Sequence, residues 1–198
     1  MTTVTAPAIA PPRIFPPTPT EFLRSWFSRC PADQFVELRA LHARSKSPRQ
    51  EFFRLAALDD LVGDGFRLVE DYDVYFGVCP RVRPQGRKED VTHAPGFWAD
   101  LDFKRFADGE AGALRKLAGF PIKPSWIVAT GGGWHLYWKL AEVVRWDASM
   151  QGRLRGIVKM LDADIAATDC ARVLRLAGTF NHKYPDCQVR IIAWPTSD

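Results

Sequence analysis

Residues 126–140 read WIVATGGGWHLYWKL, which is the pattern of two β-strands joined by a glycine turn. Alternation after the turn places His135 and Tyr137 together on a polar face of the second strand. Gly132 and Gly133 leave backbone N–H groups exposed and permit close approach by a phosphate or a sugar. Two interpretations stay open: a ligand-binding turn flanked by His135, or a tight structural turn with a hydrogen-bonded histidine.

A second strand-like segment, residues 97–103 (FWADLDF), carries two acids. Alternation places Asp100 and Asp102 on one face, together with Trp98, and the other apolar side chains on the opposite face. Carboxylates at this spacing start roughly 6 to 7 Å apart, so both can converge on one hard cation or on a pair of cations. The alternative is an edge strand with a solvated acidic face.

A third segment, residues 162–183, places acids before cations. In chain order it contains Asp162, Asp164, Asp169, Arg172, Arg175 and Lys183. Guanidinium groups match phosphate oxygens bidentately, and lysine adds a compact positive charge. The segment is therefore a candidate polyphosphate site whose acids could complete a metal site begun by the acidic strand. The alternative is an exposed helix end with internal salt bridges.

The N-terminal part is predicted to be a proline-rich tail followed by helices. Six of the 15 prolines lie within the first 20 residues, so we expect a flexible tail over residues 1–19. Apolar side chains then recur at helical spacing over residues 20–27 and 35–41. A capping box at Ser47, with proline next to it, predicts a third helix over residues 48–63.

Short strands dominate the remainder of the chain. Two helices interrupt them, one over residues 111–118 and one that begins at an N-cap, Asp147. Helices followed by interspersed strands indicate an α+β domain, with helices on one face of a mainly antiparallel sheet. We expect one domain over residues 20–198, helical at about 20–65, with the sheet at about 70–195. The predicted strands are residues 73–79, 96–103, 125–130, 135–140 and 189–194.

Composition is that of a globular domain of 198 residues, 46% hydrophobic and 25% charged. No stretch approaches the roughly 20 apolar residues of a membrane span, and the first residues lack the order of a signal peptide. We therefore expect a cytoplasmic protein with no membrane partner. The net charge of +4 is compatible with a polyanionic partner. Four scattered cysteines without a CxxC pair predict reduced, packed thiols.

Taken together, the three segments resemble the catalytic core of the archaeo-eukaryotic primase (AEP) superfamily, in particular primase-polymerases of plasmid (RepB-like), phage and CRISPR-associated type. Those proteins carry a strand-borne DxD, a Gly-x-x-His-x-Tyr-Trp hairpin, and an Asp before an Arg-x-x-Arg-Leu-Pro-Gly-Thr-x-Asn-x-Lys string. The resemblance covers about residues 71–194 and implies an RRM-like, mainly antiparallel sheet with flanking helices. The matching strings here are Asp100 to Asp102, Gly131 to Trp138, and Asp164 followed by Arg172 to Lys183.

The resemblance implies a DNA primase-polymerase, a nucleotidyltransferase that makes or extends primers on a single-stranded DNA template from nucleoside triphosphates. Asp100, Asp102 and Asp164 would hold two Mg²⁺ or Mn²⁺ ions for two-metal transfer. Asp169 is the alternative to Asp164 as the third acid. The partners implied are template, primer strand and nucleotide, with further helicase or nuclease domains expected in a longer parent protein. Nucleotide binding would fall to Gly132, Gly133, His135, Arg172, Arg175 and Lys183.

A basic loop at residues 81–88 precedes the acidic strand. Arg81, Arg83 and Lys88 are candidates to grip template phosphates, and the alternative is a solvated surface loop. The tryptophans Trp98 and Trp134 are candidates to stack on bases, although a tryptophan more often belongs to the core.

Two other functions stay open. One is a non-catalytic replication or origin DNA-binding domain on the same fold, which would gain nothing from repelling carboxylates near DNA. The other is a metal-dependent nuclease, which would need a water-activating base. The Arg-Arg-Lys string fits triphosphate binding better than hydrolysis, so the primase-polymerase is the preferred hypothesis.

Overall fold

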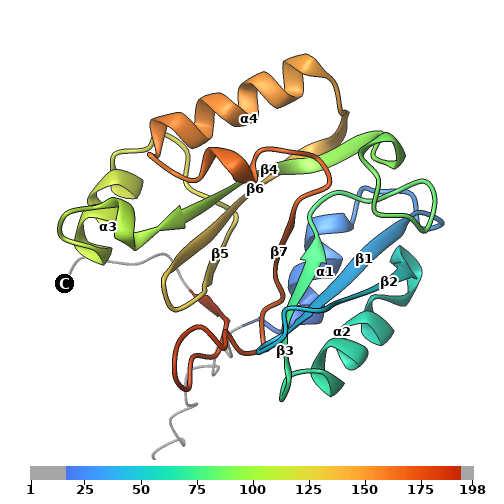
Figure 1. Ribbon diagram of the computed structural model, residues 1–198. Coiled ribbons are helices and arrows are strands. Elements are labelled where there is room, and N and C mark those ends of the chain that lie inside the picture. The colour runs from blue at the N-terminus through green and yellow to red at the C-terminus, as the bar shows by residue number, and fades with distance from the viewer. Residues whose placement is uncertain (1–16, 193–198) are drawn as a thin grey trace, which may run out of the picture.

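The computed structural model describes residues 17–192, which form two four-stranded antiparallel sheets with flanking helices. The strand order is β2-β1-β3-β7 in the first sheet and β4-β6-β5-β8 in the second. In Figure 1 the two sheets lie on either side of the segment that leads into β7. The predicted α+β class is confirmed, with the strands divided between two sheets.

The first sheet pairs the N-terminal strands with β3 and the short β7. Helix α1 has the capping box of Thr18 and Glu21 and proline at its start, so it begins slightly earlier than predicted. Thr18 and Pro19, which were predicted to belong to the tail, therefore form the cap and first residue of this helix, and residues 1–16 lie outside the described part of the chain. The elements are α1 (Pro19–Phe27), β1 (Phe35–His42), β2 (Pro48–Arg54), η1 (Leu55–Ala57), α2 (Leu58–Arg67), β3 (Tyr72–Gly77) and β7 (Val173–Arg175).

Two of the predicted helices are wrong. Residues 35–41 form β1, and the segment that begins at Pro48 forms β2 and reaches a helix only at Leu58. In β1 the buried apolar side chains are Val36, Leu38 and Ala40, a period of two that helix-spaced leucines obscure. Strand β2 is a largely exposed edge strand, so no apolar pattern marks it.

The second sheet follows the sequence predictions closely. The acidic segment and both arms of the glycine hairpin are strands, and the helices over residues 111–118 and after Asp147 are present. The last predicted strand is found as β8, whereas Trp194 lies outside the described residues. The elements are η2 (Lys88–Asp90), β4 (His93–Asp102), η3 (Phe103–Arg105), α3 (Glu110–Ala118), β5 (Trp126–Ala129), β6 (Gly133–Arg145), α4 (Ala148–Met160), η4 (Ile165–Ala167) and β8 (Arg190–Ile192).

Helix α1 packs between the two sheets and joins their cores. The Phe22 ring lies 5.8 Å from Phe76 of β3 and 5.0 Å from Tyr137 of β6, measured between centroids. The Trp26 ring lies 5.2 Å from Tyr137 and donates its indole N–H to the carbonyl of Val78. Tyr137 is therefore buried, although alternation placed it on a polar face with His135.

The two tryptophans considered for base stacking belong to the core. Trp98 is fully buried, donates its indole N–H to the Ala167 carbonyl at 2.7 Å and stacks on Trp146. Trp134 is buried on the opposite face of the second sheet, edge-on to Phe103. The stacking hypothesis is therefore wrong, because segments distant in sequence cover both faces of β4 and β6.

Helix α4 provides a direct test of the N-cap prediction. The Asp147 carboxylate accepts the backbone N–H of Met150 at 2.9 Å, and this bond is available only while the helix is folded. Asp147→Ala is expected to lower the free energy of unfolding by about 1 kcal/mol, measured by urea denaturation. Ser149→Ala, at an exposed position of the same helix, serves as control and should not destabilise. Equal losses in both variants would contradict the capping role.

Within residues 17–192, no helix has both the length and the apolar composition needed to cross a bilayer.

Candidate active site

A polar pocket of about 150 Å³ lies between the end of β4, the β5–β6 hairpin and the segment that contains β7. The acids come from the end of β4, the glycines and histidine from the β5–β6 hairpin, and the cations from β7 and the loop after it. Segments far apart in the sequence therefore meet in one cavity. Its lining residues are Asp100, Asp102, Thr130, Gly132, Gly133, His135, Arg175, Asn181, Lys183 and Tyr184.

Strand pairing places the paired acids opposite the hairpin. Asp100 lies across from His135, and Asp102 across from Gly133. Both carboxylates are partly open to solvent, with 35% and 25% of their side chains exposed. Asp102 forms an ion pair with Lys104 at 2.6 Å and accepts the backbone N–H of that residue. Partial burial raises the pKa of Asp102, but the hydrogen bonds and charge of Lys104 outweigh it and hold that pKa below its ordinary value.

His135 is a buried histidine that nevertheless lines the pocket. Its Nε2 atom lies 3.8 Å from an oxygen of Asp100, beyond hydrogen-bond distance, and its Nδ1 has no partner within residues 17–192. Burial lowers the pKa of His135, while the charge of Asp100 opposes this shift and that of Arg175 adds to it. Burial thus favours the neutral form of this imidazole, whose unpartnered Nδ1 can bind a polar ligand group.

Neighbouring atoms pack closely against the glycine turn and leave no room for side chains at its positions. A Cβ atom at Gly133 would lie 2.2 Å from the Leu101 carbonyl oxygen, and one at Gly132 would lie 2.2 Å from the Tyr184 hydroxyl. Gly131 has a φ of +90°, a backbone conformation that L side chains rarely adopt. Gly133 is thus needed to bring the hairpin against β4, and Gly132 leaves room for Tyr184. Both glycines line the pocket.

The cations reach the pocket from a segment that follows the hairpin and α4 in the sequence. Arg175 ends β7, and Lys183 lies in the following loop. Between them Asn181 is buried, donates its side-chain amide to the Thr130 carbonyl at 2.6 Å and accepts the backbone N–H of Lys183. Asn181 therefore fastens the cationic loop to the glycine hairpin.

Three residues predicted to bind metal or nucleotide, Asp164, its alternative Asp169, and Arg172, lie outside the pocket lining. Asp164 donates its backbone N–H to the Asp100 carbonyl at 2.8 Å, but its carboxylate caps η4 through the backbone of Ala166. Asp169 forms an ion pair with Arg172 at 3.2 Å. The structure thus brings the backbone of Asp164 beside Asp100, and pairs the other two residues with each other.

The structure contradicts one of the three template contacts predicted for the basic loop at residues 81–88. Arg81 is fully buried and paired with the equally buried Glu37 at 2.6 Å, so its assignment as a template contact is wrong. The positive charge of Arg81 neutralises the buried carboxylate of Glu37. A sequence pattern alone does not show that the two residues meet. Arg83, paired with Asp90, and Lys88 are both exposed, and for them template contact stays a prediction.

Sequence reasoning did not select three of the lining residues. Thr130, Asn181 and Tyr184 flank the predicted motifs, yet only the meeting of the hairpin with the last loop shows their role. Asn181 could have been noticed in residues 178–183. It is an uncharged amide between Gly-Thr and lysine, and such a side chain often holds a loop in place by hydrogen bonds. Nothing in the sequence pointed to Tyr184.

The acidic pair suits a hard divalent cation. Carboxylate oxygens are the ligands that Mg²⁺ and Mn²⁺ prefer, and the two side chains share one face and one pocket. Within residues 17–192, no group of three or more His, Cys, Asp or Glu side chains is placed to hold a metal ion. Water and the oxygens of a bound phosphate complete Mg²⁺ sites of this kind.

Comparison with known proteins gives structural matches. The AEP domain of the cyanophage S-2L primase-polymerase superposes with a TM-score of 0.65 at 17% identity, covering 88% of each chain. The catalytic domain of the primase RepB′ in complex with initiator DNA gives 0.60 at 18% identity, covering 87% of this chain and 83% of that one. Another structure of primase RepB′ gives 0.58 at 18% identity, and the chain spans 55% of its length. No protein-family model and no curated protein sequence matches the chain.

These matches define the class of fold. The chain has the fold of the AEP-type catalytic domains of primases and primase-polymerases, as the motif resemblance predicted. Identities of 17–18% establish the fold and leave the chemistry to be argued from this chain's own residues.

Proposed function

We propose that the chain is the catalytic domain of a DNA primase-polymerase, which transfers nucleotidyl groups from NTPs or dNTPs to synthesise or extend primers on single-stranded DNA. The observation that carries this proposal is the pocket, which joins paired carboxylates, a glycine turn and two cations on an AEP fold. A structural neighbour in complex with initiator DNA supports a DNA partner.

In this proposal, Asp100 and Asp102 hold divalent Mg²⁺ or Mn²⁺ ions. Asp164 is the candidate third acid, because its backbone already adjoins Asp100, whereas Asp169 is engaged by Arg172. Bound metal would favour ionisation of the primer 3′-hydroxyl and would neutralise the triphosphate. The positions of the carboxylates would determine where the primer 3′-hydroxyl and the triphosphate meet.

The opposite wall of the pocket suits the triphosphate. Arg175 and Lys183 supply positive charge to the bound triphosphate, and this charge stays in place as pyrophosphate leaves. Backbone N–H groups of Gly132 and Gly133 and the neutral ring of His135 add uncharged donors. Because the residues that line the pocket are mostly polar or charged, recognition of the base would fall to the template strand.

Labelled-nucleotide incorporation tests the proposal. The chain is incubated with single-stranded DNA, with and without a primer, in Mg²⁺ or Mn²⁺. Product without a primer supports a primase, and product only with a primer supports a polymerase. DNA binding with no incorporation would favour the non-catalytic replication domain, and shortening of the DNA would favour the nuclease.

The Lys104–Asp102 ion pair gives a prediction about metal dependence. Lys104 competes with a cation for the Asp102 carboxylate, so Lys104→Met should lower the Mg²⁺ concentration for half-maximal incorporation, by less than about fivefold. A Mg²⁺ titration measures this. Lys159→Met, at an exposed position on α4, is the control and should leave the titration unchanged. An increased Mg²⁺ requirement in Lys104→Met would contradict this competition.

A further inference from the structure

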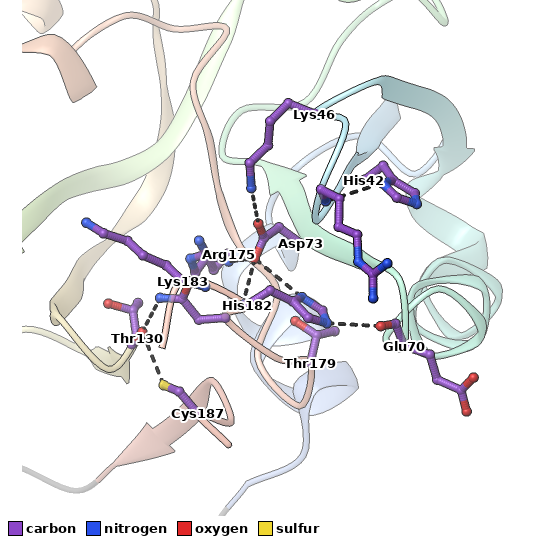
Figure 2. Close-up of polar contacts among 12 residues, drawn as sticks. His42, Lys46, Glu70, Asp73, Thr130, Arg175, Thr179, His182, Lys183 and Cys187 are labelled. Carbon is purple, nitrogen blue, oxygen red and sulfur yellow. Dashed lines mark hydrogen bonds and ion pairs between the residues drawn. The ribbon is translucent and has the colours of Figure 1, made fainter. Parts of the chain in front are cut away.

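A buried carboxylate lies behind the pocket without lining it. Asp73, on β3, has only 4% of its side chain exposed and accepts or pairs with groups from three other segments. One oxygen meets Arg175 at 2.8 Å and the backbone N–H of His182 at 3.0 Å, and the other meets Lys46 at 3.4 Å. Figure 2 shows Asp73 at the centre of these contacts.

Arg175 is held on two sides. Strand pairing places Arg175 directly opposite Tyr75, and its guanidinium carbon lies 4.9 Å from the centre of that ring. Asp73 and Tyr75 stand two residues apart on β3, so both side chains point to the same face of the sheet. A charged hydrogen bond and an aromatic ring together restrict a side chain that would otherwise be flexible.

The second contact of Asp73 fixes the cationic loop. The backbone of His182 is the donor, and its neighbours on either side, Asn181 and Lys183, both line the pocket. The ring of His182 is held in turn by the Glu70 carbonyl at 3.1 Å. One carboxylate therefore holds both Arg175 and the backbone of His182, which lies in the loop that carries Lys183.

Electrostatics favour an ionised Asp73. Burial raises its pKa, but the hydrogen bonds and charge of Arg175, the His182 amide and Lys46 outweigh burial and bring that pKa below its ordinary value. A buried charge of this kind orients the donors around it, because leaving it unpaired would be costly.

We propose that Asp73 is a positioning residue for polyphosphate binding: it holds Arg175 and the Asn181–Lys183 loop in the geometry that meets the triphosphate. The inference deepens the proposed function and rests on it for the identity of the ligand. Asp73 acts through Arg175, so its effect should appear in the affinity for the triphosphate more than in the maximal rate.

The test measures binding of inorganic tripolyphosphate and of dATP by calorimetry, together with KM and kcat for incorporation. Asp73→Asn keeps an oxygen that can accept from His182 but removes the charge that holds Arg175. Loss of one charged hydrogen bond should weaken tripolyphosphate binding by about ten- to hundredfold and raise KM for dATP more than it lowers kcat. In an Arg175→Ala background the same substitution should add less than about twofold.

Val74→Ala is the matched control. It shortens a fully buried side chain on the same strand, on the opposite face, and so weakens β3 without touching the pocket. Binding in Val74→Ala should match that of the unaltered chain below its unfolding temperature. Equal binding in Asp73→Asn and the unaltered chain, or equal losses in Asp73→Asn and Val74→Ala, would overturn the inference.

Binding and incorporation measured on the unaltered chain distinguish failure of the positioning role from failure of the proposed function. Tight tripolyphosphate binding that depends on Asp73, without any incorporation, would keep the positioning role and overturn the polymerase assignment. Binding of neither tripolyphosphate nor dATP would overturn both.

Discussion

Replacement of Asp100 and Asp102 together with alanine is expected to reduce nucleotide incorporation by at least about a thousandfold. These are the acids that the structure places side by side in the pocket, facing His135 and the glycine turn. A metal ion contributes several kcal/mol to stabilisation of transition-state charge, and each 1.4 kcal/mol corresponds to about a factor of ten in rate. Incorporation of labelled nucleotides on a primed template measures the loss.

The same variant should still fold and bind single-stranded DNA. Neither carboxylate is part of the apolar core, and removal of two neighbouring negative charges relieves repulsion both within the site and toward DNA phosphates. Asp108→Ala is the control, because Asp108 is an exposed acid of the next turn whose partner is Arg115. Retained incorporation in the double variant would exclude this pocket as the place of chemistry.

The second large effect concerns stability. Glu37 of β1 and Arg81 form an ion pair in which both side chains are fully buried, and Glu37 also accepts from Gln50 at 2.8 Å and from Arg39. Glu37→Gln leaves the Arg81 guanidinium buried without its counter-charge. We expect a loss of about 3–5 kcal/mol in the free energy of unfolding, measured by urea denaturation.

A matched acid on the neighbouring strand provides the control. Glu51 of β2 is 43% exposed and pairs with Arg49 at 3.4 Å, so Glu51→Gln should change stability by less than about 1 kcal/mol. Replacement of both buried charges, as Glu37→Leu with Arg81→Met, should restore part of the stability that Glu37→Gln loses. Equal stability of Glu37→Gln and Glu51→Gln would contradict the stabilising role of the buried ion pair.

The candidate site was predictable where its residues lie close together in the sequence. Alternation within β4 placed Asp100 and Asp102 on one face, and the glycine hairpin placed His135 beside them once the two segments were assigned to neighbouring strands. Motif order then linked these segments to Arg175 and Lys183, which do line the pocket. The AEP fold suggested by the motifs is confirmed by the structural matches.

The N-terminal strands and several side-chain roles were not predictable in the same way. Helix-spaced leucines in β1 competed with the alternating pattern, and only pairing with β2 and β3 decided between them. Arg81 was read as a surface cation because its partner, Glu37, lies 44 residues away. Asp73 carried no signal, since its contact with Arg175 spans 102 residues.

The sequence by itself determined the strands of the second sheet, the acidic pair, the glycine turn and the cationic string, because each is written in residues that neighbour one another along the chain. Only the tertiary structure decided which residues on a given face of β4 or β6 are buried and which line the pocket. His135 and Tyr137 share a face, yet α1 covers the tyrosine and leaves the histidine at the pocket. Trp98 and Asp100 also share a face of β4, yet the tryptophan is buried and the aspartate lines the pocket. Burial depends on which distant segments pack there, and strand periodicity contains no information about those segments.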